Sequence, residues 1–422
     1  MDKILENYTF DIDVIILPHK ELCKLPDLTR FTKLKVLYCS NNLLTKLHNL
    51  PNTIIKLNCE RNQLTELHNL PHTLIELNCK RNQLTELHNL PNTIMELNCN
   101  YNQLTKLTNL SNTLTKLYCE YNQLTELSKL SNTLTKLYCS FNKLTELNNL
   151  PNSLIELSCN NNQLLKLNSL PNILTILDCN NNKLLELNNL PNTLTKLYCG
   201  CNQLMQLSNL PNTLIGLFCC CNQLTELSNL PNTLIKLNCV DNQLTELHNL
   251  PNTLIELYCG HNQLTELNNL PKSLTVLYCN SNKLTELTNL PNTLTDLCCC
   301  DNRLIKLNNL PNILTSLDCS KNKLTQLNNF PNTLISLDCS KNKLTKLSNL
   351  PNTICDYEFD CSGNKLLFTE LLELKKLDNF IQFFNLNKLL KVIFLYSVKK
   401  RCLKYKEELI IKTCHPSRLF FI

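Results

Sequence analysis

Glycine and tryptophan are scarce in this sequence, which has four glycines and no tryptophan among its 422 residues. So few glycines leave no glycine-rich loop for the phosphates of a nucleotide, and we predict no cofactor. No stretch approaches the roughly 18 apolar residues of a membrane-spanning helix. Acidic residues precede the first apolar run, 14–17, so the start of the chain does not resemble a secretory signal peptide.

A twenty-residue unit repeats through most of the chain. Residues 51–70, PNTIIKLNCERNQLTELHNL, form the type unit, and the same frame returns every 20 residues until 350, giving fifteen copies without a gap. Such a period is typical of a solenoid, because one repeat cannot bury its apolar face without its neighbours. We number the positions of the repeat from 1 to 20, starting at Pro51.

The first half of the repeat predicts a short strand and a turn. Leu57, Asn58 and Cys59 alternate as in a β-strand, with Leu57 and Cys59 on the inward face. Asn62 follows at position 12, where its side-chain amide can bond backbone groups that a turn leaves unpaired.

The second half of the repeat predicts an extended return arm. Leu64, Leu67 and Leu70 recur every three residues, and Pro71 opens the next unit. Because proline and asparagine disfavour a helix, we expect a polyproline-like arm closed by a Pro-Asn turn.

The pattern Leu-x-x-Leu-x-Cys-x-x-Asn-x-Leu, formed by Ile54, Leu57, Cys59, Asn62 and Leu64, resembles the leucine-rich-repeat consensus over about residues 31–370. The short repeat and its Leu-Pro junction resemble secreted bacterial effectors. The abundant asparagine and the cysteine in place of leucine are similar to leucine-rich-repeat proteins of giant amoeba-infecting viruses. The resemblance implies a leucine-rich-repeat solenoid with a parallel β-sheet on its concave face and extended arms on its convex face.

We expect three parts in the chain. Residues 1–30 form an N-terminal cap whose first strand lies within 13–17. Residues 31–366 form the solenoid of about 17 repeats, with a two-residue slip of the frame after 351. Residues 367–422 have apolar residues at helical spacing and eleven Lys and Arg against five Asp and Glu, which predicts a small, basic, helical C-terminal cap.

The 26 cysteines are mostly a repeated core residue. Sixteen of them, Cys39 to Cys339, occupy position 9, where a free cysteine behaves as a small apolar side chain. Free thiols in this number indicate a reducing compartment, so we expect a cytoplasmic protein, in the host cytoplasm if the chain is viral.

Positions 8 and 11 form columns when the sequence is read in steps of twenty, and we expect them on the concave strand face. Five aromatic residues gather in these columns within three repeats, with two arginines before them: Tyr101, Tyr118, Tyr121, Tyr138, Phe141, Arg61 and Arg81. Clustered exposed aromatic residues are common anchors of protein interfaces. The alternative is an aromatic ladder that only supports packing of the sheet.

Metal-ligating residue types also share columns. Cys201, Cys221, Asp241 and His261 follow one another at position 11, but they span about 14 Å and one ion cannot contact all four. Cys201 and Cys221 could share a metal or a disulfide, but the favoured explanation is variation of a cysteine-rich repeat. The same applies to Cys298-Cys299-Cys300, where Cys299 is the core residue, and to the arm histidines His48, His68 and His88. We therefore predict no metal site.

No arrangement of a nucleophile with an acid or base appears, so we do not expect an enzyme. The favoured function is a non-enzymatic scaffold that binds another protein on its concave face, and, if the resemblance to viruses holds, one that acts on host factors. Two alternatives stay open: a ubiquitin-ligase substrate adaptor, and a binder of nucleic acid or an anionic surface through the basic residues 367–422.

Overall fold

The computed structural model describes residues 3–127, 129–347, 349–355 and 358–366. The predicted helical cap at 367–422 lies outside these described residues. Two compact units divide the chain, Met1–Leu194 and Thr195–Ile422.

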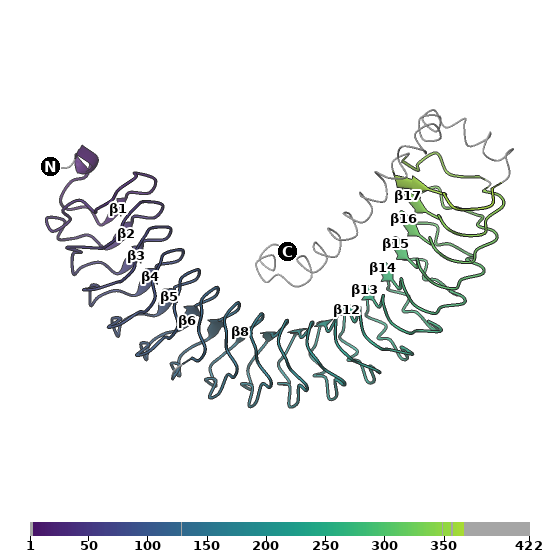
Figure 1. Cartoon of the computed structure of the whole chain (residues 1–422), viewed down its shortest axis with the longest axis horizontal. Helices are drawn as coiled ribbons and strands as arrows, with labels where there is room; N and C mark the ends of the chain where they lie inside the picture. Colours follow the sequence, from purple (N-terminus) through teal and green to yellow (C-terminus); the bar gives the residue numbers. More distant parts are fainter. Residues whose placement is uncertain (1–2, 128, 348, 356–357, 367–422) are drawn as a thin grey trace. The chain divides into compact units, whose positions relative to one another are not determined.

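In the first unit, parallel three-residue strands are stacked side by side, and the arms lie on the other side of the strands (Figure 1). The strands pair in register at a spacing of 20 residues, so that Leu57 stands beside Leu77. The elements are η1 (Lys3–Leu5), β1 (Val14–Ile16), β2 (Val36–Tyr38), β3 (Lys56–Asn58), β4 (Glu76–Asn78), β5 (Glu96–Asn98), β6 (Lys116–Tyr118), β7 (Lys136–Tyr138), β8 (Glu156–Ser158) and β9 (Ile176–Asp178).

The second unit repeats the same arrangement. Its last strand is paired two residues out of the twenty-residue frame, with Phe359 beside Leu337, which confirms the predicted slip. The strands are β10 (Lys196–Tyr198), β11 (Gly216–Phe218), β12 (Lys236–Asn238), β13 (Glu256–Tyr258), β14 (Val276–Tyr278), β15 (Asp296–Cys298), β16 (Ser316–Asp318), β17 (Ser336–Asp338) and β18 (Phe359–Asp360).

Strand β1 adds to the N-terminal end of the stack. Strand β1 pairs in parallel with β2, with Ile15 beside Leu37. Almost no surface is exposed at Ile15, Leu17 or Leu28. The apolar edge of the first full repeat is therefore not left open to water.

The core consists of one leucine or cysteine row for each inward position. All sixteen cysteines at position 9 have no exposed surface, and none of the 24 cysteines in the described residues is joined in a disulfide. The core position predicted for these cysteines is thus confirmed. Burial raises the pKa of most of these thiols, for example that of Cys99 to about 12, which keeps them protonated.

An asparagine ladder ties each repeat to the next. The side-chain Oδ1 of Asn62 accepts a hydrogen bond from the Leu44 amide at 3.0 Å, and its Nδ2 donates to the carbonyls of Cys39 and Cys59, both at 3.0 Å. The same pattern recurs along both units. This is the backbone-satisfying role predicted for position 12, and it explains how a chain with so little glycine turns at the end of every strand.

The arms contain no helix in the part of the chain that the structure describes, which confirms the extended arm. Each arm ends in a turn in which the amide at position 4 donates to the carbonyl at position 1, as Leu74 does to Pro71 at 3.1 Å. The Thr73 hydroxyl then donates to the Ile54 carbonyl of the preceding repeat at 2.7 Å. The described residues include no helix long and apolar enough to cross a membrane.

Candidate functional site

Position 8 closes each strand, whereas position 11 lies three residues beyond it. The sequence analysis placed both positions on the strand face, and for position 11 this is wrong. Tyr101, Tyr121 and Phe141 are in the left-handed region, with φ angles of 55°, 53° and 55°. The chain must leave the sheet there to bring the next residue into the asparagine ladder, although this conformation costs a non-glycine residue about 1–2 kcal/mol.

The five predicted aromatic residues lie in two parallel stacks. Tyr101, Tyr121 and Phe141 stack at centroid distances of 4.1 Å each, with ring planes within 10°. Tyr118 and Tyr138 stack at 5.1 Å and 18°. These contacts arise because the twenty-residue register brings equivalent side chains to the spacing of adjacent strands.

Stacking alone does not distinguish a binding surface from a packing ladder. In the second unit Tyr198 and Phe218 also stack, at 4.6 Å, but Tyr198 is only 7% exposed. Tyr101 is 36% exposed, and the other four rings of the two stacks are half-buried. The rings in the first unit thus combine mutual packing with a face open to solvent.

A basic group covers the open end of the longer stack. The Arg81 guanidinium lies 5.1 Å from the centre of the Tyr101 ring, and the Lys80 ammonium lies 5.7 Å from it. These distances suit a cation–π interaction. Arg61, one repeat earlier in the same column, is exposed. Among the described residues neither arginine is in an ion pair.

Ion pairs border the shorter stack. The Tyr138 hydroxyl donates a hydrogen bond to Glu156, which also pairs with Lys136 at 2.8 Å. Lys116 pairs with Glu96 at 3.0 Å. Burial, and then the hydrogen bond to Glu156, raise the pKa of Tyr138 and keep its hydroxyl a donor.

Sequence reasoning missed position 10, which carries Glu120 close to both stacks. The Glu120 carboxylate accepts a hydrogen bond from Asn100 Nδ2 at 3.0 Å, and burial raises its pKa. After burial, the negative charge of Glu120 contributes to raising the pKa of the hydroxyls of Tyr118, Tyr121 and Tyr138. The signal was present, because positions 8 and 10 share a face whenever strand alternation continues past position 8.

The metal-ligating column at position 11 is a chain of pairwise contacts. Cys221 Sγ lies 3.7 Å from Asp241 Oδ2, and His261 Nδ1 lies 3.8 Å from Asp241 Oδ1. In the described residues one group of three metal-ligating residues does converge on a point, and it consists of Cys298, Cys300 and Asp318. The histidines of the arms pair with exposed glutamates instead, as His68 does with Glu66 at 3.0 Å.

Parallel strands with a twenty-residue period, a leucine and cysteine core, an asparagine ladder and extended arms define a leucine-rich-repeat solenoid, and the chain belongs to the leucine-rich-repeat family. It is similar to YopM from Yersinia enterocolitica, with 34% identity over 84% of this chain and 83% of that chain and a TM-score of 0.76. This similarity confirms the resemblance to bacterial effector repeats.

Two further solved structures are similar. The functional domain of InlJ from Listeria monocytogenes, described as including a cysteine ladder, shares 26% identity over 83% of this chain and 72% of that chain, with a TM-score of 0.58. The circular leucine-rich-repeat protein CroV588 shares 29% identity over 78% of this chain and 57% of that chain, with a TM-score of 0.50. CroV588 confirms the resemblance to giant-virus repeats. No protein-family model matches the chain, and no curated protein matches its sequence.

Proposed function

We propose that this protein is a non-enzymatic scaffold that binds another protein through the aromatic surface of its first unit. The aromatic surface consists of Arg61, Arg81, Tyr101, Tyr118, Tyr121, Tyr138 and Phe141. The observation that carries the proposal is the pair of partly exposed ring stacks, one at the ends of the strands and one in the turns that follow them. Function on this fold resides in the surface side chains and not in the repeated frame.

The stacks are suited to binding because they are already ordered. Each ring of the longer stack is held by its neighbour at 4.1 Å, so little rotamer freedom remains to be lost on association. Tyrosine and arginine are also the residue types that most often dominate the energy of an interface. Polar groups around the rings, among them Glu156 and Lys136, supply the rim.

The charges indicate the kind of partner. Arg61 and Arg81 present guanidinium groups at one end of the surface, and Arg81 is oriented by Tyr101. A partner with an apolar or aromatic anchor and a carboxylate beside it would fill the stacks and pair with the arginines. The sixteen buried thiols favour an encounter in a reducing compartment such as the cytoplasm.

A double substitution tests the proposal. Photo-cross-linking from position 121 of the full chain identifies the partner, and its affinity is then measured for Tyr118→Ala with Tyr138→Ala. We expect a loss of about 2–4 kcal/mol in binding if both rings are anchors. Stability changes less, because neither ring belongs to the leucine core.

The second unit offers a matched control. Tyr258 and Tyr278 occupy the same position of the repeat and form a T-shaped, edge-to-face contact with ring centroids 5.2 Å apart. Tyr258→Ala with Tyr278→Ala removes the same atoms away from the aromatic surface, and we expect binding to be retained. Equal affinities for the two double variants would contradict the proposed surface.

A further inference from the structure

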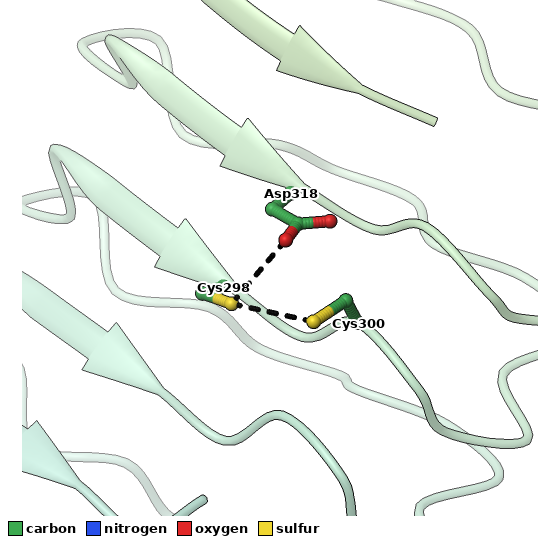
Figure 2. Close-up of side chains that lie close together, drawn as sticks. All are labelled: Cys298, Cys300 and Asp318. Atoms are coloured by element: carbon green, nitrogen blue, oxygen red, sulfur yellow. Dashed lines mark hydrogen bonds between the residues drawn. The ribbon is translucent and has the colours of Figure 1, made fainter. Parts of the chain in front are cut away.

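Three consecutive cysteines with two different roles stand at the end of strand β15, which closes at Cys298 and is followed by Cys299 and Cys300. Cys299 is fully buried at position 9, as in every repeat. Cys298 and Cys300 therefore share the opposite face, and both are only partly buried. Their Sγ atoms lie 3.7 Å apart (Figure 2). The two thiols thus lie side by side on the face of the sheet that is turned away from the core.

A carboxylate from the next strand completes the group. The parallel register places Asp318 of β16 directly beside Cys298. Asp318 Oδ2 lies 3.7 Å from Cys298 Sγ, and the ligand atoms of all three residues lie within 4.8 Å of one another (Figure 2). Two neighbouring repeats thus bring three metal-ligating residues close together.

The carboxylate is held in place by its own repeat. Asp318 Oδ1 accepts hydrogen bonds from the Ser320 amide at 3.0 Å and from the Ser320 hydroxyl at 2.7 Å. Ser320 is 6% exposed, so this support is buried. The other oxygen, Oδ2, is left to face the thiols. Outer contacts of this kind orient the ligands of many metal sites.

We propose that Cys298, Cys300 and Asp318 form a binding site for a zinc-type divalent cation. Zinc bonds of about 2.3 Å to sulfur and 2.0 Å to oxygen at tetrahedral angles would separate the two sulfurs by about 3.8 Å and sulfur from oxygen by about 3.5 Å. The observed separations are both 3.7 Å. With the third pair, Cys300 and Asp318, within 4.8 Å, the three ligand atoms lie close to the spacing that such a cation needs.

The donor set selects the metal. Two sulfurs and one carboxylate oxygen suit zinc, whereas magnesium and calcium take oxygen ligands alone. Three protein ligands leave a fourth coordination position for water or for a group of a partner. The site departs from the sequence-based expectation of no metal, because that expectation weighed Cys298-Cys299-Cys300 without Asp318, which the strand register brings beside them.

Binding releases two protons to solvent, one from each thiol, since zinc binds thiolates. Affinity should therefore increase with pH. The negative charge of Asp338, which stands beside Asp318 on β17, adds to the attraction for a cation.

The experiment uses the full-length chain, reduced and freed of metal. Zinc is titrated in competition with a chromophoric chelator, and cobalt is used as a spectroscopic probe. We expect one tight zinc ion per chain and a sulfur-to-cobalt absorption band. Ser320→Ala should weaken binding by about 10–100-fold. Cys298→Ser and Cys300→Ser should weaken it more, since each removes a ligand.

Cys201→Ser is the matched control, because Cys201 is a partly buried cysteine of the same unit outside the group. It should leave zinc affinity unchanged. The proposal is overturned if the wild-type chain binds no stoichiometric zinc or if Cys201→Ser weakens binding as much as Cys298→Ser. It is also overturned if Cys298 and Cys300 form a disulfide that reduction does not convert to a metal site. If a variant fails to fold, as judged by circular dichroism, the cobalt band of the wild-type chain decides alone.

Discussion

Removal of one asparagine side chain should expose one particular amide to exchange with solvent. In the Asn142→Ala variant, the Leu124 amide loses its acceptor, Asn142 Oδ1, which lies 2.9 Å away. The side-chain Nδ2 of Asn142 also donates to the carbonyls of Cys119 and Cys139, at 2.9 and 3.0 Å. All of these groups are buried, so water does not replace the lost partner without a local opening.

The expected magnitude follows from which groups keep a partner. The Cys119 carbonyl still accepts from Asn122 Nδ2 at 3.2 Å, and the Cys139 carbonyl still accepts from Asn162 Nδ2 at 3.0 Å. Only the Leu124 amide is left without one. A buried unsatisfied donor costs about 1–3 kcal/mol, which corresponds to about 5–150-fold faster exchange if the native state is destabilised locally by that amount.

Native-state hydrogen exchange at Leu124 measures this effect directly. Lys143→Ala is the control, because the Lys143 side chain is exposed on the neighbouring residue and bonds only to the exposed Gln123 side chain. It should leave the exchange of Leu124 unchanged. Exchange of Leu124 in Asn142→Ala that stays within twofold of the wild-type rate would refute the account of the asparagine ladder.

Three further predictions concern other parts of the repeat. Burial raises the pKa of Asp178 to about 7, above the 3.8 of an ordinary Asp, so folding takes up a proton. The contribution of this group to the free energy of unfolding should be greatest below about pH 4 and fall by up to about 4 kcal/mol as the pH rises through 7. In urea titrations, Asp178→Asn should lose this dependence on pH, whereas the exposed Asp27→Asn should keep it. Lys321 has a φ of 53°, and Lys321→Asn should stabilise by about 0.5–1 kcal/mol in thermal melts, whereas Lys323→Asn, at an exposed position of ordinary φ, should not. Thiol counting in denaturant without reductant should find most of the 26 cysteines reduced, and recovery of fewer than half would contradict a reducing compartment.

Most of the fold could be predicted from the repeat because its period carries the information several times over. The strand at positions 7 and 8, the inward Cys59 and the bonding of Asn62 each follow from local alternation and from the need to pair backbone groups. Fifteen copies of the frame confirm each inference independently. Even the two-residue delay of Phe359 could be predicted, since Cys361 and Asn364 of the same repeat are delayed by the same amount.

The geometry after the strand could not be predicted in the same way. A left-handed residue is usually signalled by glycine or asparagine, and here Tyr101, Arg81 and Lys321 take that conformation. Glycine appears at this point in the shifted last repeat, as Gly363 with a φ of 69°. The direction of position 11 depends on this turn and became clear only from the structure, whereas Glu120 and Cys300 at position 10 follow from continued strand alternation and were missed.

The division between fixed and variable positions also explains how one frame can carry different surfaces. The asparagine ladder and the inward rows satisfy most backbone groups and bury the core, while side chains at position 8 add single bonds, such as the one that the Ser320 amide donates to Asp318. The exposed side chains of these columns vary around that frame, and they form stacked rings in the first unit and the Cys298, Cys300 and Asp318 group in the second. Neighbouring repeats then decide the chemistry, because each variable side chain meets its equivalent one strand away. A site on this fold is therefore built from pairs of repeats, and a single substitution changes it without disturbing the scaffold.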